Sequence, residues 1–277
     1  MPSDIMKIII FTDLDGTLLD HNDYSFEDAR SSLTRIKGKD IPLIITTSKT
    51  RKEVESLRNI LGINDPFIVE NGGGIFFPEG YRGFNVKNSL ARHPYAVLEL
   101  GKPYDKIKRF LKRAGKQFAI RGFDDLTIQE IMEFTGLPVD DATMAKEREF
   151  TEPFVLQRES DLDVFSDLAM REGMKVVRGG RFFHLISVHQ DKGKAVKITK
   201  DIFRENYGEE VITIGLGDRE NDLPMLENVD IPVLMPYCNG GYEELNLQNL
   251  IKSKYPGSKG WNESVKEILN DLERDDF

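Results

Sequence analysis

Four short segments of this 277-residue chain place acidic, hydroxyl and ammonium side chains beside runs of apolar residues. They are Asp13-Leu14-Asp15-Gly16-Thr17, Thr47-Ser48-Lys49-Thr50, Asp191-Lys192-Gly193-Lys194 and Gly217-Asp218-Arg219-Glu220-Asn221-Asp222. Carboxylates that share a site repel one another unless a cation lies between them, whereas hydroxyl and ammonium groups can hold phosphate oxygens. If the fold brings these groups together, they form a site suited to phosphoryl transfer.

The carboxylates predict a magnesium site. Asp13 and Asp15 are two residues apart, so an extended backbone directs both side chains the same way. Asp218 and Asp222 would join them from the end of a neighbouring strand. A hard divalent cation with oxygen ligands is the natural partner of such acids, and near a phosphate it is usually Mg²⁺. Asp15-Gly16 alone fits a simple turn equally well, but a second acidic pair after another buried strand is harder to explain that way.

Two candidates supply the opposite charge and the hydrogen-bond donors. Lys192 precedes an expected helix, and Thr47 offers a hydroxyl and backbone donors at the start of another, which is a typical anion site. A lone lysine at a helix start is more often solvated surface, so its predicted role depends on the neighbouring carboxylates.

An alternation of strands and helices is expected to position these segments. Continuous apolar runs predict buried parallel strands, and apolar residues three or four apart predict helices. In the outer thirds we expect strands over 7–12, 42–47, 67–70, 211–216 and 231–235, and helices starting at 25 and 50 and covering 194–207 and 222–228. This is the pattern of an α/β fold with a doubly wound, mainly parallel, Rossmann-like sheet, in which ligands bind beyond the carboxyl ends of the strands.

The middle of the chain predicts a different, α+β arrangement. We expect helices over 104–114, from 127, from 140 and over 161–171, and strands near Phe118, Phe154, Val176 and Leu185. Two domains follow: a core of residues 1–88 and 190–277, and an inserted α+β cap of residues 89–189. Gly72-Gly73-Gly74 lacks the lysine and hydroxyl residue of a phosphate-binding P-loop, so it is interpreted as a hairpin turn.

Composition excludes several classes of protein. The net charge of −9 disfavours nucleic acid and anionic membranes as partners, and no apolar run is long enough for a transmembrane helix. Cys238 is the only cysteine, which excludes a disulfide framework and a thiolate zinc site. We therefore expect a cytoplasmic protein.

In order and type, the four segments resemble the motifs of the haloacid dehalogenase superfamily, specifically the phosphatases with a large α+β (Cof-like) cap. The resemblance implies that Asp13 is the nucleophile and Asp15 the general acid and base. It implies that Thr47 and Lys192 hold the phosphoryl oxygens. The implied Mg²⁺ ligands are Asp13, the backbone carbonyl of Asp15, Asp218, Asp222 and Asn221.

A narrower resemblance is to the mannosyl-3-phosphoglycerate phosphatase subfamily. It is carried by 47–51, 70–73, 148–154, 179–184 and 259–263. It implies hydrolysis of 2-O-mannosyl-3-phosphoglycerate to mannosylglycerate and phosphate, as part of the biosynthesis of a compatible solute. The small phosphorylated sugar or glycerate substrate would contact Lys49, Asn71, Arg148, Thr151, Arg181 and His184. Arginine suits the glycerate carboxylate, although arginines in strands are more often solvated.

Other functions stay open. Within the superfamily, the alternatives are a Cof-like phosphatase of broad sugar-phosphate range and a sucrose-phosphate phosphatase or phosphomannomutase relative. Outside enzymes, they are a sugar-phosphate binding protein and a phospho-accepting signalling module. The second acid of the first segment argues against the signalling module, because a long-lived phosphorylated state has no use for an acid or base beside the acceptor.

Overall fold

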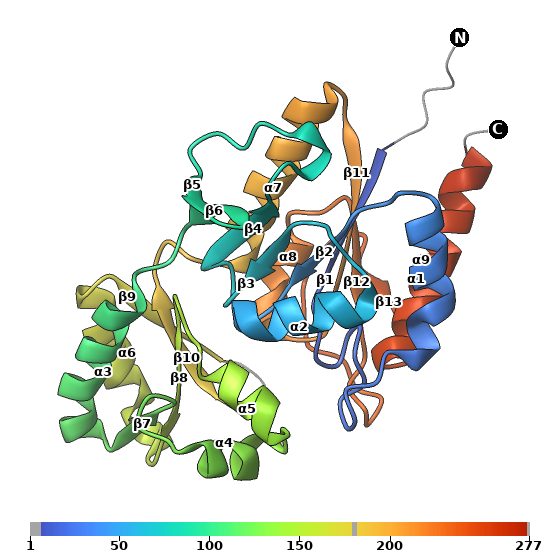
Figure 1. The fold of residues 1–277 in the computed structure, drawn as a ribbon. Helices are drawn as coiled ribbons and strands as arrows, with labels where there is room; N and C mark the ends of the chain where they lie inside the picture. The colour runs from blue at the N-terminus through green and yellow to red at the C-terminus, as the bar shows by residue number, and fades with distance from the viewer. Residues whose placement is uncertain (1–6, 179–181, 276–277) are drawn as a thin grey trace. The chain divides into compact units, whose positions relative to one another are not determined.

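The computed structural model describes residues 7–178 and 182–275 (Figure 1). These residues form two compact units. The first contains the described residues up to Thr46, Arg82–Asn85, and the described residues from Val196 onward. The second contains Thr47–Tyr81 and Val86–Ala195.

The first unit is built on a parallel sheet with strand order β13-β12-β11-β1-β2. The strands are β1 (Lys7–Thr12), β2 (Leu43–Thr46), β11 (Val211–Gly217), β12 (Ile231–Leu234) and β13 (Ile251–Lys252). β1 and β11 pair in register, from Lys7 opposite Val211 to Thr12 opposite Leu216. Their carboxyl ends therefore lie side by side, as the sequence predicts for the first and fourth motif segments.

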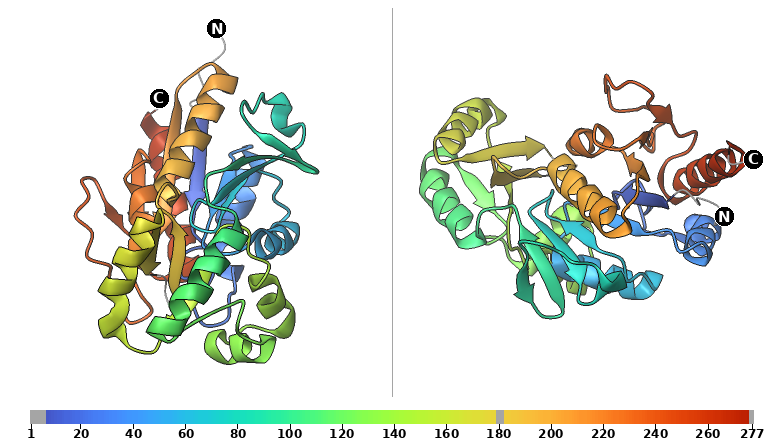
Figure 2. Two further views of the ribbon diagram at one scale, coloured as in Figure 1. Left: turned by 90° about the vertical axis from the view of Figure 1, so that its left-hand side faces the viewer. Right: turned by 90° about the horizontal axis from the view of Figure 1, so that it is seen from above.

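Helices cover both faces of this sheet (Figures 1 and 2). They are α1 (Arg30–Gly38), α7 (Lys192–Tyr207), α8 (Leu223–Leu226) and α9 (Gly257–Asp275), and a short 3₁₀ turn, η1 (Glu27–Ala29), precedes α1. α1 and α9 lie side by side on one face, where Arg35 donates to the side chain of Asn270 at 2.7 Å. α7 lies on the other face.

The second unit begins with α2 (Arg51–Leu61) and a group of antiparallel strands. Thr50 and Glu53 form the expected capping box of α2, and Gly62 ends the helix in the left-handed conformation. The strand order is β3-β4-β6-β5, with β3 (Phe67–Val69), β4 (Gly74–Pro78), β5 (Leu90–Arg92) and β6 (Tyr95–Glu99). The chain turns between β3 and β4 at residues 70–73, which confirms the predicted hairpin.

The second unit also contains a separate four-stranded antiparallel sheet, in the order β7-β8-β10-β9. Its elements are α3 (Tyr104–Phe118), β7 (Ile120–Gly122), α4 (Ile128–Thr135), α5 (Val139–Ala145), β8 (Glu152–Leu156), α6 (Leu162–Arg171), β9 (Met174–Arg178) and β10 (Phe183–Ser187). Side chains of α3 and α6 form a buried core with the strands, centred on Phe154 and Phe165.

The strand expected near Phe118 is β7, which lies two residues further along the chain, and the helix before it is longer than the expected 104–114. Phe118 is the last residue of α3, and β7 starts only at Ile120. The apolar positions of α3 continue from Ala114 to Phe118 at helical spacing, so the buried face of the helix includes Phe118. Ala119 then ends the helix in the left-handed conformation, with φ of 50°.

The predicted fold class is confirmed: a mainly parallel sheet with helices, and an α+β part with an antiparallel sheet. The predicted cap, 89–189, falls within the second unit, which also contains Thr47–Tyr81. The division of function between a catalytic core and a cap stays a prediction. None of the helices in the described part of the chain combines the length and apolar character needed to cross a bilayer.

Candidate active site

Asp13 lies directly after β1, at the carboxyl end of the parallel sheet. Its backbone N–H donates to the carbonyl of Leu216 at 2.9 Å, so it continues the ladder between β1 and β11. β1 is apolar and lies between two neighbouring strands, which fixes the position of the residue that follows it. Asp13 is only 7% exposed.

Asp218 and Asp222 occupy the corresponding end of β11. The Oδ2 atom of Asp222 accepts hydrogen bonds from the backbone N–H groups of Asp218 (3.0 Å) and Arg219 (3.1 Å). Gly217 makes this turn possible, because a Cβ there would lie only 2.5 Å from the Cβ of Asp222. The short turn η4 (Glu220–Asp222) thus returns the Asp222 carboxylate to the strand end.

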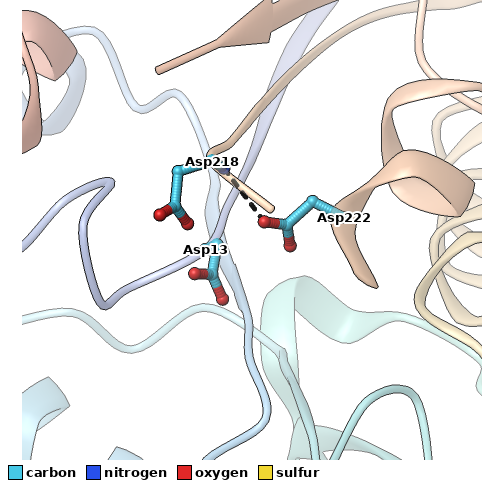
Figure 3. Close-up of side chains that lie close together, drawn as sticks. All are labelled: Asp13, Asp218 and Asp222. Atoms are coloured by element: carbon cyan, nitrogen blue, oxygen red, sulfur yellow. Dashed lines mark hydrogen bonds between the residues drawn. The ribbon is translucent and has the colours of Figure 1, made fainter. Parts of the chain in front are cut away.

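The carboxylates of Asp13, Asp218 and Asp222 converge (Figure 3). One oxygen of each lies within 4.8 Å of the others, and all three residues are buried. Arg219 offsets part of their charge, since its Nε lies 3.0 Å from Oδ2 of Asp218. Three buried carboxylates repel one another strongly unless a cation is shared between them. A donor set made only of carboxylate oxygens fits Mg²⁺.

The sequence analysis also predicted Asp15 and Asn221 as metal ligands. The cluster of three carboxylates does not include them. Asp15 is half-buried in a turn closed by a hydrogen bond from the N–H of Gly16 to the carbonyl of Leu19. Gly16 has a φ of 80°, and a Cβ there would lie 2.7 Å from Oδ2 of Asp218. Only glycine allows the turn to pass this close. Asn221 is half-buried within η4, and the part of both residues in metal binding stays a prediction.

Thr47 begins a buried loop in the second unit. Its N–H donates to the carbonyl of Ile68 at 3.1 Å, and its own carbonyl accepts from the N–H of Asn71 at 2.9 Å. Its hydroxyl oxygen accepts from the N–H of Lys49 at 3.2 Å. The Lys49 ammonium lies 3.5 Å from a carboxylate oxygen of Glu53. Three predicted site residues, Thr47, Lys49 and Asn71, therefore belong to one loop cluster.

Glu70 links this loop cluster to the segment before β8, a role that the sequence analysis missed. Its fully buried carboxylate accepts from the N–H groups of Glu149 (2.8 Å) and Phe150 (3.0 Å) and from the hydroxyl of Thr151 (2.7 Å). Burial raises the pKa of Glu70, while Arg148 and these donors act in the opposite direction. The sequence did contain one signal for this role: Glu70 stands between an apolar strand and a glycine-rich turn. A charge buried there without a partner would be unfavourable, so a partner could have been expected.

Arg148 is held against the same loop. Its guanidinium donates to the carbonyl of Ser48 at 2.8 Å and to the hydroxyl of Thr151 at 3.4 Å. Its Nε donates to the carbonyl of Ala145 at 2.8 Å. Arg148 and Thr151 thus lie together, and Arg148 is half-buried rather than solvated.

His184 and Lys192 are also buried in the second unit. Lys192 starts α7 and is 1% exposed. His184 lies in β10 opposite Pro153 and is 7% exposed, and its buried Nδ1 has no hydrogen-bond partner among the described residues. Burial and the nearby charges of Arg148 and Lys192 lower the pKa of His184 to about 3, so its imidazole is neutral. Arg181, the remaining predicted substrate residue, lies outside the described residues.

Known proteins resemble this chain along most of its length. Residues 10–240 match the model of the haloacid dehalogenase-like hydrolase family. A glucosyl-3-phosphoglycerate/mannosyl-3-phosphoglycerate phosphatase from Persephonella marina is 55% identical over 96% of this chain and 99% of its own. A mannosyl-3-phosphoglycerate phosphatase from Pyrococcus furiosus is 36% identical over 89% of this chain and 96% of its own.

The fold is similar to that of solved structures. A haloacid dehalogenase-like hydrolase from B. subtilis superimposes with a TM-score of 0.66 over 94% of this chain and 99% of that one, at 16% identity. An identity of 16% shows only that the fold is shared. The family match, in contrast, spans most of the chain and contains the three clustered acids. The chain therefore belongs to the haloacid dehalogenase-like hydrolase family.

Proposed function

We propose that this protein is a Mg²⁺-dependent phosphatase that hydrolyses the phosphate ester of glucosyl- or mannosyl-3-phosphoglycerate. One observation carries the proposal: the 55% identity to the P. marina phosphatase extends over nearly the whole of both chains. The convergence of Asp13, Asp218 and Asp222 supports it, because such acids can hold the Mg²⁺ that phosphoryl transfer uses.

In the first step, a carboxylate oxygen of Asp13 attacks phosphorus. An O–P bond forms as the ester P–O bond breaks, and Asp15 gives its proton to the departing glycerate oxygen. In the second step, Asp15 takes a proton from water while the water oxygen attacks the phosphorus of the aspartyl-phosphate. The bond between the Asp13 oxygen and phosphorus breaks, inorganic phosphate leaves, and Asp13 and Asp15 return to their starting states.

Mg²⁺ held by Asp13, Asp218 and Asp222, with Asn221 and the backbone carbonyl of Asp15, would neutralise negative charge on the phosphoryl group. Thr47 and Lys192 bind the remaining phosphoryl oxygens. The buried position of Lys192 supports this role, because an ammonium in a dry site interacts more strongly with an anion than one in water does.

Recognition of the rest of the substrate is assigned to the other predicted residues of the second unit. Arg148 would bind the glycerate carboxylate, with Lys49 and Asn71 beside that carboxylate. His184 is suited to a sugar hydroxyl, because a neutral imidazole can both donate and accept. The buried Nδ1 of His184 supports this, since a hydroxyl would complete its hydrogen bonding. Thr151 would contribute its hydroxyl, and Arg181 is proposed from the sequence alone.

The decisive experiment measures phosphate release from a panel of substrates, with Mg²⁺ and with EDTA. We expect glucosyl- and mannosyl-3-phosphoglycerate to be cleaved with a higher kcat/KM than glucose 6-phosphate, mannose 6-phosphate and sucrose 6-phosphate, and only with Mg²⁺. Faster cleavage of the hexose phosphates would favour the broad Cof-like alternative. Little phosphate release together with isomerisation driven by a bisphosphate would favour a mutase. The predicted cytoplasmic location is tested separately by cell fractionation.

A further inference from the structure

We propose that Trp261 and Thr12 are positioning residues for Asp13, acting through a chain of hydrogen bonds from α9 to the backbone carbonyl of Asp13. The assignment of Asp13 as the nucleophile rests on the function proposed above.

The chain consists of two consecutive hydrogen bonds in the first unit. The Nε1 atom of Trp261, a residue that is fully buried, donates to Oγ1 of Thr12 at 3.0 Å. The same Oγ1 donates to the carbonyl oxygen of Asp13 at 2.7 Å. An indole N–H can only donate, so it occupies an acceptor site of the hydroxyl and leaves the hydroxyl proton for Asp13. The direction of both bonds is therefore fixed.

The carbonyl that receives this proton lies where the regular sheet ends. The last residue pair of β1 and β11 is Thr12 with Leu216, and the N–H of Asp13 makes the final ladder bond. Beyond this point the ladder no longer sets the orientation of the next peptide plane. That plane fixes the ψ angle of Asp13, so a hydrogen bond to the carbonyl helps to hold the backbone from which its side chain projects.

α9 is fixed to the loop on the other side of Asp13 as well. Oδ1 of Asp20 accepts from the N–H of Ser258 at 3.0 Å, and Oδ2 accepts from its hydroxyl at 3.0 Å. The N–H of Gly257 donates to the carbonyl of Gly16 at 3.3 Å. The helix therefore contacts the chain both just before and just after Asp13. α9 is therefore in a position to hold the backbone on both sides of the nucleophile.

Thr12→Val and Thr12→Ser form the central pair of variants. Valine has the shape of threonine without the hydroxyl, whereas serine keeps both hydrogen bonds. We expect Thr12→Val to lower kcat about tenfold to a hundredfold with KM nearly unchanged, because small misplacements of a reacting group have effects of that size. Thr12→Ser should restore most of the kcat. Trp261→Phe, which removes the N–H but keeps an aromatic ring, should behave like Thr12→Val and provides the test if Thr12→Val does not fold.

Two comparisons separate positioning from loss of stability. The double variant Trp261→Phe with Thr12→Val should have the kcat of Thr12→Val alone, because both changes interrupt one chain. Thr213→Val is the matched control: Thr213 is a buried threonine of β11 whose hydroxyl donates to Asp230 at 2.7 Å, away from Asp13. It should lower the urea midpoint without lowering kcat.

Fluorescence supplies a readout that does not depend on turnover. Trp261 is the only tryptophan, so its emission reports on one place. Titration of the wild type with Mg²⁺ should change this emission, and the change should be lost in Thr12→Val while calorimetry still detects Mg²⁺ binding.

The proposal is overturned if Thr12→Val and Trp261→Phe keep kcat within about twofold of the wild type, or if Thr12→Ser is as impaired as Thr12→Val. A persisting emission response in Thr12→Val would equally overturn it. Activity is measured on p-nitrophenyl phosphate as well as on the glycosyl-phosphoglycerates. Failure of the glycosyl substrates alone would thus reject the proposed function, while p-nitrophenyl phosphate and the emission titration still decide whether the chain positions Asp13.

Discussion

Oδ2 of Asp222 accepts the backbone N–H of Asp218 at 3.0 Å, so one acid of the cluster builds the turn that carries another. Asp222 has two tasks that substitution can separate. Asp222→Asn keeps an oxygen for the backbone donors but loses the charge. We expect the urea midpoint to change little, and the affinity for Mg²⁺, measured by calorimetry, to fall at least about tenfold.

Asp230→Asn is the matched control for this prediction. Asp230 likewise accepts a backbone N–H, that of Thr213 at 2.8 Å, but its carboxylate is paired with Lys200. It should lower stability without weakening Mg²⁺ binding. Unchanged Mg²⁺ affinity in Asp222→Asn would show that the carboxylate serves only the turn.

Asp13→Asn tests the nucleophile. We expect phosphate release to fall by about 10⁴ or more, because an amide cannot form the acyl-phosphate. Stability without metal should be equal or higher, since one of three mutually repelling buried charges is removed. Activity within tenfold of the wild type would reject the assignment of Asp13, and circular dichroism checks that the fold is kept.

His184→Ala tests the sugar subsite. With a pKa of about 3, His184 stays neutral over the pH range of an assay. We expect kcat/KM for the glycosyl-phosphoglycerates to fall about tenfold or more, as for one lost hydrogen bond, equally at pH 6 and pH 8. Cleavage of p-nitrophenyl phosphate should be unchanged. His93→Ala, at an exposed histidine paired with Glu79, is the control. A loss confined to low pH would contradict a neutral imidazole.

Glu152 makes stability depend on pH. It is 1% exposed and accepts from the N–H of Asp124 (2.9 Å) and the hydroxyl of Tyr104 (2.5 Å). Burial raises its pKa to about 7, with Arg148 acting in the opposite direction. The folded protein thus holds this proton more tightly than the unfolded chain. The stabilisation is complete below the unfolded pKa of 4.5 and is lost as the pH rises through 7.

Urea unfolding at pH 4 and pH 8 checks this prediction. In the wild type, Glu152 should lower the free energy of unfolding by about 3 kcal/mol as the pH rises from 4 to 8. The Glu152→Gln variant should lack this decrease. Glu130→Gln is a control of opposite sign. A backbone hydrogen bond from Thr127 lowers the pKa of Glu130 to about 2, so the stability that the Glu130 carboxylate contributes is lost as the pH falls. The same pH dependence in Glu152→Gln and the wild type would refute the prediction.

The α/β class, the buried parallel strands and the meeting of Asp13 with Asp218 were predictable from the sequence. The physical reason is local: apolar runs identify strands buried on both faces, and in a parallel sheet the residues after neighbouring strands share one edge. The capping box of Thr50 and Glu53 was equally readable, because both partners lie within one helical turn.

Only the tertiary structure decided how these segments are fixed. Glu70 meets Thr151, and Trp261 meets Thr12 across 249 positions of the sequence, and no periodicity or spacing encodes such pairs. The extent of α3 to Phe118 was likewise decided by packing against Phe165, and the neutrality of His184 by its burial among charges contributed by other segments. Side-chain types and local patterns set which chemistry is available, whereas long-range packing sets the solvation and hydrogen bonds under which each group works.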